Sequence, residues 1–286
     1  MNNMDEQKRI PTEEWKAQKQ AERQQLFDKQ KAEIEKVTSN GKALTAYMTG
    51  RGRLGSHLSA GNAALILAQN PYARKVMSLQ EWNNFGRRIN RGAEGISVLA
   101  RRNNYWNVDK VYDLSQTYGD KQYKMLDVMS APVDLKNALN AMASLAPVEL
   151  VMVENAEVPV RYDHESKNIL IQMDTPDEDT FRMLPTAMVQ AYIQSVDGTQ
   201  ATPQVTDLYA ECVSAELCGR FNLPVLPGTE ERLEKLLPAF EKGEERTMLE
   251  EIAAFSRTMG DRVEQEFRPL QQTRGTKPPV QPGGRE

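Results

Sequence analysis

The stretch from Glu81 to Leu99, EWNNFGRRINRGAEGISVL, holds the change from helix to strand that decides how the first half of the chain folds. Ser78 lies three residues before Glu81 and completes a capping box, so a short helix is predicted over 79–85, and Gly86 ends it. The residues from Gly95 to Leu99 are mostly apolar, and Ile96 and Val98 are β-branched, which is typical of a strand. The segment therefore predicts a short helix followed by a small sheet.

Similar patterns extend this interpretation in both directions. The first half is predicted to contain helices over 12–37, 42–48 and 59–69, with Gly50, Gly52 and Gly55 interrupting the second, and strands over 95–99, 105–108 and 110–114. The second half is predicted to contain helices over 135–145, 177–195 and 205–221, a strand over 148–153, a hairpin of 158–162 and 168–173, and a charged helix over 230–270 broken near Gly243 and Gly260. The fold class is therefore α+β: a helical N-terminal domain with a small antiparallel sheet, then a second α+β domain and C-terminal helices.

Composition divides the chain into five segments. They are a charged helix (1–40), an N-terminal domain (41–128), a second domain (132–226), a charged helical extension (228–270) and a tail rich in Pro and Gly that is expected to be disordered (271–286).

The charge of the chain is unevenly distributed. The whole chain has 36 Lys and Arg against 40 Asp and Glu, a net charge of −4, which excludes a globally basic nucleic-acid binder. Residues 1–40 are neutral, residues 41–105 hold 10 basic and 2 acidic residues, and residues 106–286 hold 18 and 30. An anionic partner is therefore expected to bind the segment 41–105.

Several classes of protein are disfavoured by what the sequence lacks. It has no apolar run long enough to cross a membrane and no leader pattern, so we expect a cytoplasmic protein without a membrane partner. The two cysteines do not form a C-x-x-C pair, and the only histidines, His57 and His164, cannot build a three-histidine site. No metal and no other cofactor is predicted.

Four motifs occur in order over about 55 residues: NAALILAQNPYA (62–73), EWNNFGRRI (81–89), RGAEGISVL (91–99) and VYDLSQT (111–117). Together they resemble the N-terminal domain of the ArdC/LtrC family of antirestriction proteins. The resemblance implies a domain that binds single-stranded DNA, joined to a zincin-like metallopeptidase domain. It also implies a protein of conjugative plasmids and transposons that protects incoming DNA from host restriction.

The second domain departs from this family at the peptidase centre. The helix that should carry H-E-x-x-H reads FRMLPTAMVQAY (181–192), so Thr186 and Gln190 occupy the two histidine positions and Ala187 that of the catalytic glutamate. Glu211, in a later segment that resembles the family's A-E motif, would be a single carboxylate ligand. Thr and Gln are poor substitutes for two imidazoles on zinc, and Ala cannot act as a base. We therefore expect a catalytically dead pseudo-peptidase and no enzyme activity.

Single-strand binding needs cations for phosphates and aromatic faces for bases. The basic segment supplies these candidates: Arg51, Arg53, Tyr72, Arg74, Lys75, Arg87, Arg88, Arg91, Arg101, Arg102, Tyr105 and Trp106. Gly52, Gly92 and Gly95 are expected to let the backbone approach phosphates. Trp82 and Tyr112 are expected in the core, and for Trp106 both base stacking and packing stay open.

Two other functions remain open. The chain can instead be a phage- or plasmid-borne inhibitor that contacts a host defence nuclease, either a restriction or a CRISPR effector, through its acidic part; this would be an anti-CRISPR or anti-nuclease role. An active metallopeptidase would require that His164, Glu211 or Glu216 replace the missing ligands, and the chain contains no H-E-x-x-H.

Overall fold

The computed structural model describes residues 12–55, 57–123, 128, 132–195 and 201–273. The predicted tail over 271–286 lies mostly outside this range. The helices are α1 (Thr12–Val37), α2 (Gly41–Leu54), α3 (Ala60–Gln69), α4 (Leu79–Phe85), α5 (Pro132–Ala143), α6 (Asp177–Ser195), α7 (Pro203–Arg220), α8 (Thr229–Leu236) and α9 (Glu245–Thr273), with 3-10 turns η1 (Leu114–Gln116) and η2 (Leu237–Ala239). The strands are β1 (Val76–Ser78), β2 (Arg88–Ile89), β3 (Ile96–Arg102), β4 (Tyr105–Asp113), β5 (Thr117–Tyr118), β6 (Leu150–Val153), β7 (Val160–Asp163) and β8 (Asn168–Gln172).

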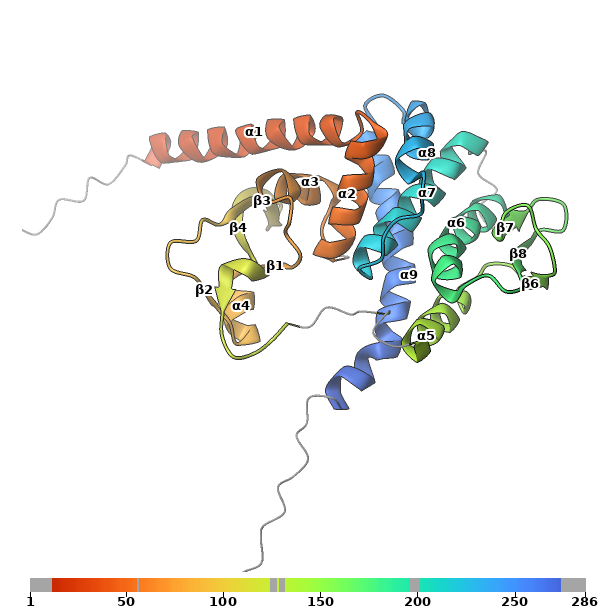
Figure 1. The fold of residues 1–286 in the computed structure, drawn as a ribbon. Helices are drawn as coiled ribbons and strands as arrows, with labels where there is room; N and C mark the ends of the chain where they lie inside the picture. Colours follow the sequence, from red (N-terminus) through yellow and green to blue (C-terminus); the bar gives the residue numbers. More distant parts are fainter. Residues whose placement is uncertain (1–11, 56, 124–127, 129–131, 196–200, 274–286) are drawn as a thin grey trace, which may run out of the picture.

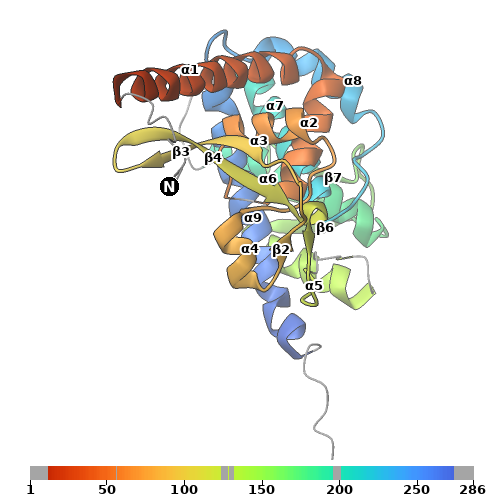
Figure 2. The same ribbon diagram turned by 90° about the vertical axis from the view of Figure 1, so that its left-hand side faces the viewer.

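The predicted α+β class is confirmed. Strands β1, β4 and β3 form an antiparallel sheet, and β2 pairs with β5. With α3 and α4 they make a unit that we call the N-terminal lobe (Figure 1). At the other end of the molecule β6, β8 and β7 form a mixed sheet, in which β8 is parallel to β6 and antiparallel to β7. Figure 2 shows α1 lying across the β3–β4 hairpin.

The motifs at 62–73 and 111–117 have clear structural roles. Asn62 and Gln69 lie two helical turns apart on α3. Each side-chain amide makes two hydrogen bonds of 2.8–3.0 Å to one residue of β3, donating to its C=O and accepting from its N–H. Asn62 pairs with Leu99 in this way, and Gln69 pairs with Ser97. The two amides thus pair with the edge strand as a neighbouring strand would, which protects it from other partners. Gln116 closes a capping box with Asp113 at the end of β4.

One hydrophobic core joins the two predicted domains. It contains Leu44 and Met48 of α2 together with Leu184 of α6 and Val213 of α7, all of them no more than 1% exposed. Helix α9 runs through the middle of the molecule beside α5 and α7 (Figure 1). The N-terminal segment is therefore packed directly against the C-terminal helices.

The prediction that Gly50 and Gly52 interrupt the second helix is wrong, because α2 continues through both of them to Leu54; the third glycine, Gly55, does end the helix, with a φ of +100°. A Cβ on Gly52 would lie 2.0 Å from the carbonyl oxygen of Glu216, and one on Gly219 would lie 2.1 Å from that of Thr49. The glycines are therefore the residues that let α2 and α7 pack backbone against backbone.

Two further predictions are corrected. The strands expected over 105–108 and 110–114 are one strand, β4, because its pairing with β3 runs without a gap from Tyr105 to Val111. The charged helix does break at Gly243, where φ is +91°, but not at Gly260, which lies inside α9. A Cβ on Gly260 would lie 2.2 Å from the Arg220 guanidinium, so this glycine makes room for a side chain of α7.

Candidate nucleic-acid interface

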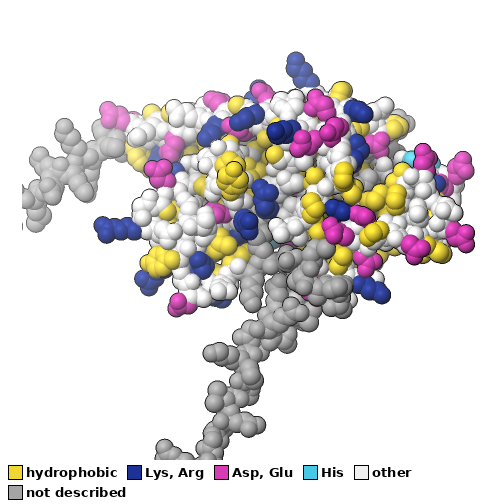
Figure 3. All heavy atoms as spheres, in the orientation of Figure 1, with side chains coloured by type: hydrophobic (Ala, Val, Ile, Leu, Met, Phe, Trp, Pro, Cys, Tyr) yellow, Lys and Arg dark blue, Asp and Glu magenta, His cyan; other side chains and the backbone are white. Residues whose placement is uncertain are grey.

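Most of the predicted DNA-binding residues lie in three places on or beside the N-terminal lobe. One predicted residue, Arg51, lies in the core instead. The first place is a pocket next to Tyr72, the second is the tip of the β3–β4 hairpin, and the third is strand β2 with the loop after it. On the face shown in Figure 3, Lys and Arg predominate over this lobe, whereas Asp and Glu gather over the β6–β8 end.

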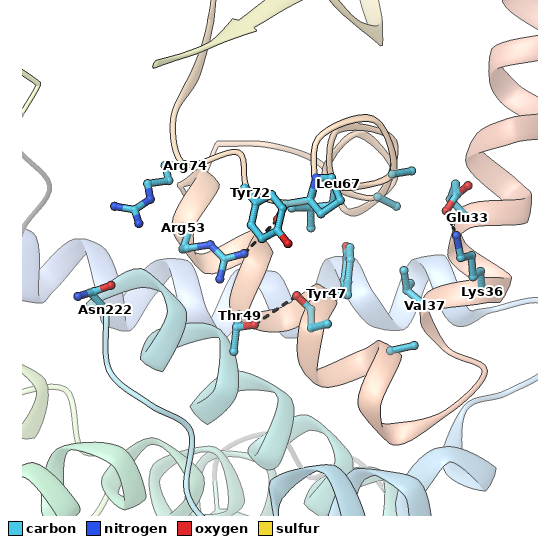
Figure 4. A pocket seen from close by; sticks show the side chains of 15 residues that line it. Glu33, Lys36, Val37, Tyr47, Thr49, Arg53, Leu67, Tyr72, Arg74 and Asn222 are labelled. Carbon is cyan, nitrogen blue, oxygen red and sulfur yellow. Dashed lines mark hydrogen bonds and ion pairs between the residues drawn. The ribbon is translucent and has the colours of Figure 1, made fainter. Parts of the chain in front are cut away.

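A pocket of about 670 Å³ opens between α1, α2 and α3 (Figure 4). Arg53 lies in the last turn of α2, while Tyr72 and Arg74 lie on the loop that follows α3, and all three line the same end of the pocket. Tyr72 is 85% exposed. Arg53 donates a hydrogen bond to the Pro71 carbonyl at 3.3 Å, which holds the loop against α2.

The loop carrying these residues is fixed by its backbone. The Asn70 side chain accepts a hydrogen bond from the Tyr72 N–H at 3.2 Å. The buried Asp113 carboxylate accepts bonds from the N–H groups of Arg74 and Lys75 at 2.8 and 3.2 Å. Since the backbone is anchored on both sides of Tyr72, its exposed ring is presented from a defined position.

The hairpin tip presents a second set of side chains. Asn103 and Asn104 both have positive φ, 47° and 67°, which suits the tight two-residue turn that joins twisted strands. Tyr105 is 75% exposed beside Arg101 and Arg102, but Arg102 already pairs with Asp109 at 2.6 Å. The tip is therefore less basic than the sequence indicated.

Trp106 is the residue for which stacking and packing were both open. Its ring packs edge-to-face on Phe27 of α1 with centroids 5.6 Å apart, yet 38% of the residue is exposed. The contact fixes the hairpin to α1 and leaves part of the indole accessible.

In the third place, at β2, the adjacent residues Arg87 and Arg88 have different surroundings. Arg87 donates to the Thr117 side chain and to the carbonyls of Thr117, Gly119 and Lys121 at 2.8–3.2 Å, so its guanidinium holds the β5 segment in place. Arg88 is exposed, as is Arg91, and neither has an ion pair among the described residues.

The burial of Arg51 corrects its assignment to the DNA-binding set. Its side chain is 1% exposed and pairs with Glu216 of α7 inside the core, with a second bond to the Leu58 carbonyl at 3.2 Å. Burial alone would lower the pKa of Arg51, but Glu216 and Tyr47 raise it, so the guanidinium is held in its charged form. A side chain in this position does not reach a phosphate.

The lysine and glycines of the basic segment are also only partly available. Lys75 is partly buried over the Tyr123 ring, at 5.7 Å from its centroid, and this burial lowers its pKa. Gly52 lies in the core, and a Cβ on Gly95 would meet the Tyr112 ring at 3.0 Å, so both glycines serve packing rather than phosphate approach. Gly92 has a φ of +79°, and no described atom lies within 4 Å of the point that a Cβ would occupy, so its backbone is open.

The four positions predicted to mark a lost peptidase centre lie on α6 and α7. Ala187 is buried, and Thr186 is partly exposed on the same helix. Gln190 donates a hydrogen bond to Asp207 of α7 at 2.8 Å. The Glu211 carboxylate is instead held by Arg232 at 2.6 Å and by Thr229 of α8 at 3.2 Å. The α7 carboxylate beside the predicted site is therefore Asp207, one turn before Glu211.

Neither Asp207 nor Asn222 is among the site residues predicted from the sequence. Asn222 follows α7 with a φ of +58° and lines the same end of the pocket as Arg53 (Figure 4). An Asn just after a helix is a signal for a helix end, but nothing in the sequence relates it to pocket residues that precede it by 148 positions or more.

Among the residues the structure describes, no group of three or more His, Cys, Asp or Glu side chains is placed to hold a metal ion. None of the helices in that part of the chain combines the length and apolarity that crossing a membrane requires.

Comparison with known proteins gives similarity of fold only. No family model matches the sequence, and no curated protein does. Among solved structures, the metal-free crystal structure of the antirestriction protein ArdC from plasmid R388 superposes with a TM-score of 0.52 at 12% identity, covering 83% of this chain and 97% of that one. The Mn(II)-bound structure of the same protein gives 0.50 at 14% identity, covering 85% and 99%. The chain therefore has the fold of ArdC over most of its length.

Proposed function

We propose that this chain is an antirestriction-type protein of a mobile element that binds single-stranded DNA through its N-terminal lobe. The observation that carries the proposal is the convergence of Arg53, Tyr72 and Arg74 on one pocket, in a fold like that of ArdC. Cations beside an exposed ring are what a single strand needs, since its bases stack on aromatic faces and its phosphates follow the positive charge. The exposed Arg88 and Arg91 would extend this surface.

The proposal predicts binding that is salt-dependent and favours single strands over duplex. The logarithm of the affinity should fall linearly with the logarithm of the salt concentration, since each phosphate contact to a single strand adds about 0.7 to the slope. In an electrophoretic shift series, Arg88→Ala with Arg91→Ala should lower the slope by about 1.4.

The control is Lys242→Ala with Arg246→Ala, which removes the same charge from exposed positions outside the lobe. An equal fall in slope for both double variants would mean that only the net charge of the protein matters. That result would contradict the assignment of Arg88 and Arg91 to the DNA-binding surface. Absence of single-strand binding at low salt would contradict the proposed function itself.

We further propose that the α6–α7 region is a pseudo-peptidase without bound metal. One solved ArdC structure carries Mn(II), but here the residues at the expected positions do not suit a metal: Gln190 is bonded to Asp207, and Glu211 is neutralised by Arg232. Thr186 and Ala187 supply neither an imidazole nor a base.

Purified protein incubated with zinc or manganese and then desalted should contain no stoichiometric metal by elemental analysis. The matched variant Thr186→His with Gln190→His places two imidazoles at i and i+4 beside Asp207, and we expect it to retain zinc. One ion per chain in the unaltered protein would overturn the pseudo-peptidase proposal.

A second candidate is inhibition of a host defence nuclease by protein contact. It is favoured by the acidic side chains that gather over the β6–β8 end (Figure 3). Nuclease inhibition that stays unchanged when single-strand binding is weakened in the Arg88 and Arg91 double variant would support this candidate over the first.

A further inference from the structure

The pocket beside Tyr72 has the size and the walls of a ligand site. Its volume of about 670 Å³ lies within the range of pockets that hold small organic ligands. The walls are mostly small or aliphatic side chains of α2 and α3, with Tyr47 and Thr49 among them, and the charged groups lie at the two ends (Figure 4). The apolar wall residues are Ala43, Ala46, Ala64, Leu67 and Ala68.

The two ends differ in charge. At one end Lys36 is neutralised by Glu33 of the same helix at 3.6 Å. At the other end Arg53 and Arg74 line the pocket, and neither makes an ion pair with any carboxylate in the described part of the chain. Burial, and then the charge of Arg74, lower the pKa of Arg53, as expected for two cations that share one site. An anion bound at this end would offset their repulsion.

The same end also holds an aromatic face and an amide. Tyr72 is 85% exposed, and no ring contact or hydrogen bond of its side chain exists within the described residues. Its backbone is nevertheless fixed by Asn70, as described above, so stacking of a planar group on the ring requires little further ordering of the loop. Asn222 adds a side-chain donor and acceptor at the pocket rim.

We propose that this pocket takes one unstacked nucleotide of a single DNA strand, with its phosphate between Arg53 and Arg74 and its base on the Tyr72 ring. This inference rests on the proposed single-strand function. It makes the Tyr72 ring the position at which a strand with bases binds differently from a bare phosphate chain.

The test uses the full-length protein and two oligonucleotides of equal length, oligo-dT and an abasic strand with the same phosphates, in fluorescence anisotropy titrations. Tyr72→Ala should weaken dT binding roughly tenfold, since one base stack contributes about that much, and should leave abasic binding unchanged. Tyr72→Phe keeps the ring and should bind dT like the unaltered protein. Arg74→Ala should lower the salt slope by about 0.7 with both strands.

Lys36→Ala is the matched control, because it removes one positive charge from the same pocket at the end where that charge is already paired. Both Tyr72 and Arg74 are exposed, and a thermal melt of each variant confirms that the fold is intact. If Tyr72→Ala loses dT and abasic binding equally, or if Arg74→Ala and Lys36→Ala behave alike, the pocket inference is overturned while single-strand binding stands. If the unaltered protein binds neither strand, the proposed function fails first.

Discussion

Replacing Gly52 with alanine should destabilise the protein by at least about 3 kcal/mol, the upper end of ordinary overpacking costs. The added Cβ would lie 2.0 Å from the Glu216 carbonyl oxygen and 2.7 Å from the Arg220 nitrogen, and both atoms belong to the backbone of α7. A backbone atom of a packed helix cannot rotate away as a side chain can, so α2 and α7 must move apart. Thermal unfolding followed by circular dichroism should show a midpoint roughly 6–12 °C lower.

Gly50→Ala is the control on the same helix. Its Cβ would meet the methyl groups of Leu67 at 2.9 Å, and these lie at the end of a flexible side chain. The alanine also favours the helix by up to about 1 kcal/mol, so the net change should be small. Equal unfolding midpoints for the two variants would contradict the close packing of α2 on α7.

Replacing Arg51 with methionine should cost about 3–5 kcal/mol at neutral pH, the usual result of leaving one buried charge without its partner. Glu216 is 6% exposed, and one of its carboxylate oxygens has no hydrogen-bond partner among the described residues. Burial already raises the pKa of Glu216, and the charge of Arg51 is the largest influence that lowers it. Without Arg51 the pKa of this carboxyl rises further.

The loss should therefore depend on pH. In the variant the folded state keeps a proton on Glu216, whereas the unfolded chain releases it near its ordinary pKa of about 4.3. The pKa of Glu216 is higher in the folded state than in the unfolded chain. The variant therefore loses stability as the pH rises from the unfolded pKa toward the folded pKa, by up to about 1.4 kcal/mol per pH unit. Chemical denaturation at several pH values should show a difference from the unaltered protein that is small near pH 4 and large at pH 7.

Glu216→Gln separates this effect from simple loss of packing. It leaves Arg51 charged at every accessible pH, so its destabilisation should not follow the same pH course. The double variant Arg51→Met with Glu216→Gln removes both charges and should be more stable than either single variant. A pH-independent loss in Arg51→Met would contradict the buried ion pair.

Local signals in the sequence predicted much of the fold correctly. The capping box at Ser78, the start of α3 near Ser59 and the hairpin around 163–167 lie where the patterns placed them, because helix starts and turns depend on neighbouring residues. The predictions failed at Gly50, Gly52 and Gly260, where the glycines lie inside helices. At these positions a residue distant in the chain packs against the helix where the Cβ of another residue type would lie. No pattern among neighbouring residues in the sequence indicates such a contact.

The candidate site divides in the same way. Composition located the basic segment, but adjacent or nearby arginines have opposite roles: Arg51 is buried and Arg53 is not, and the Arg87 guanidinium is hydrogen-bonded to the β5 segment whereas the Arg88 side chain is exposed. Helical spacing does not assign the roles of Arg51 and Arg53 without knowledge of which face of α2 meets α7. The sequence by itself therefore determined the fold class, the charge asymmetry and the absence of an H-E-x-x-H motif, since each is a property of composition or of near neighbours. Only the tertiary structure decided which cations reach solvent and that Asn222 and Tyr72 line one pocket, because burial and convergence depend on contacts between distant helices.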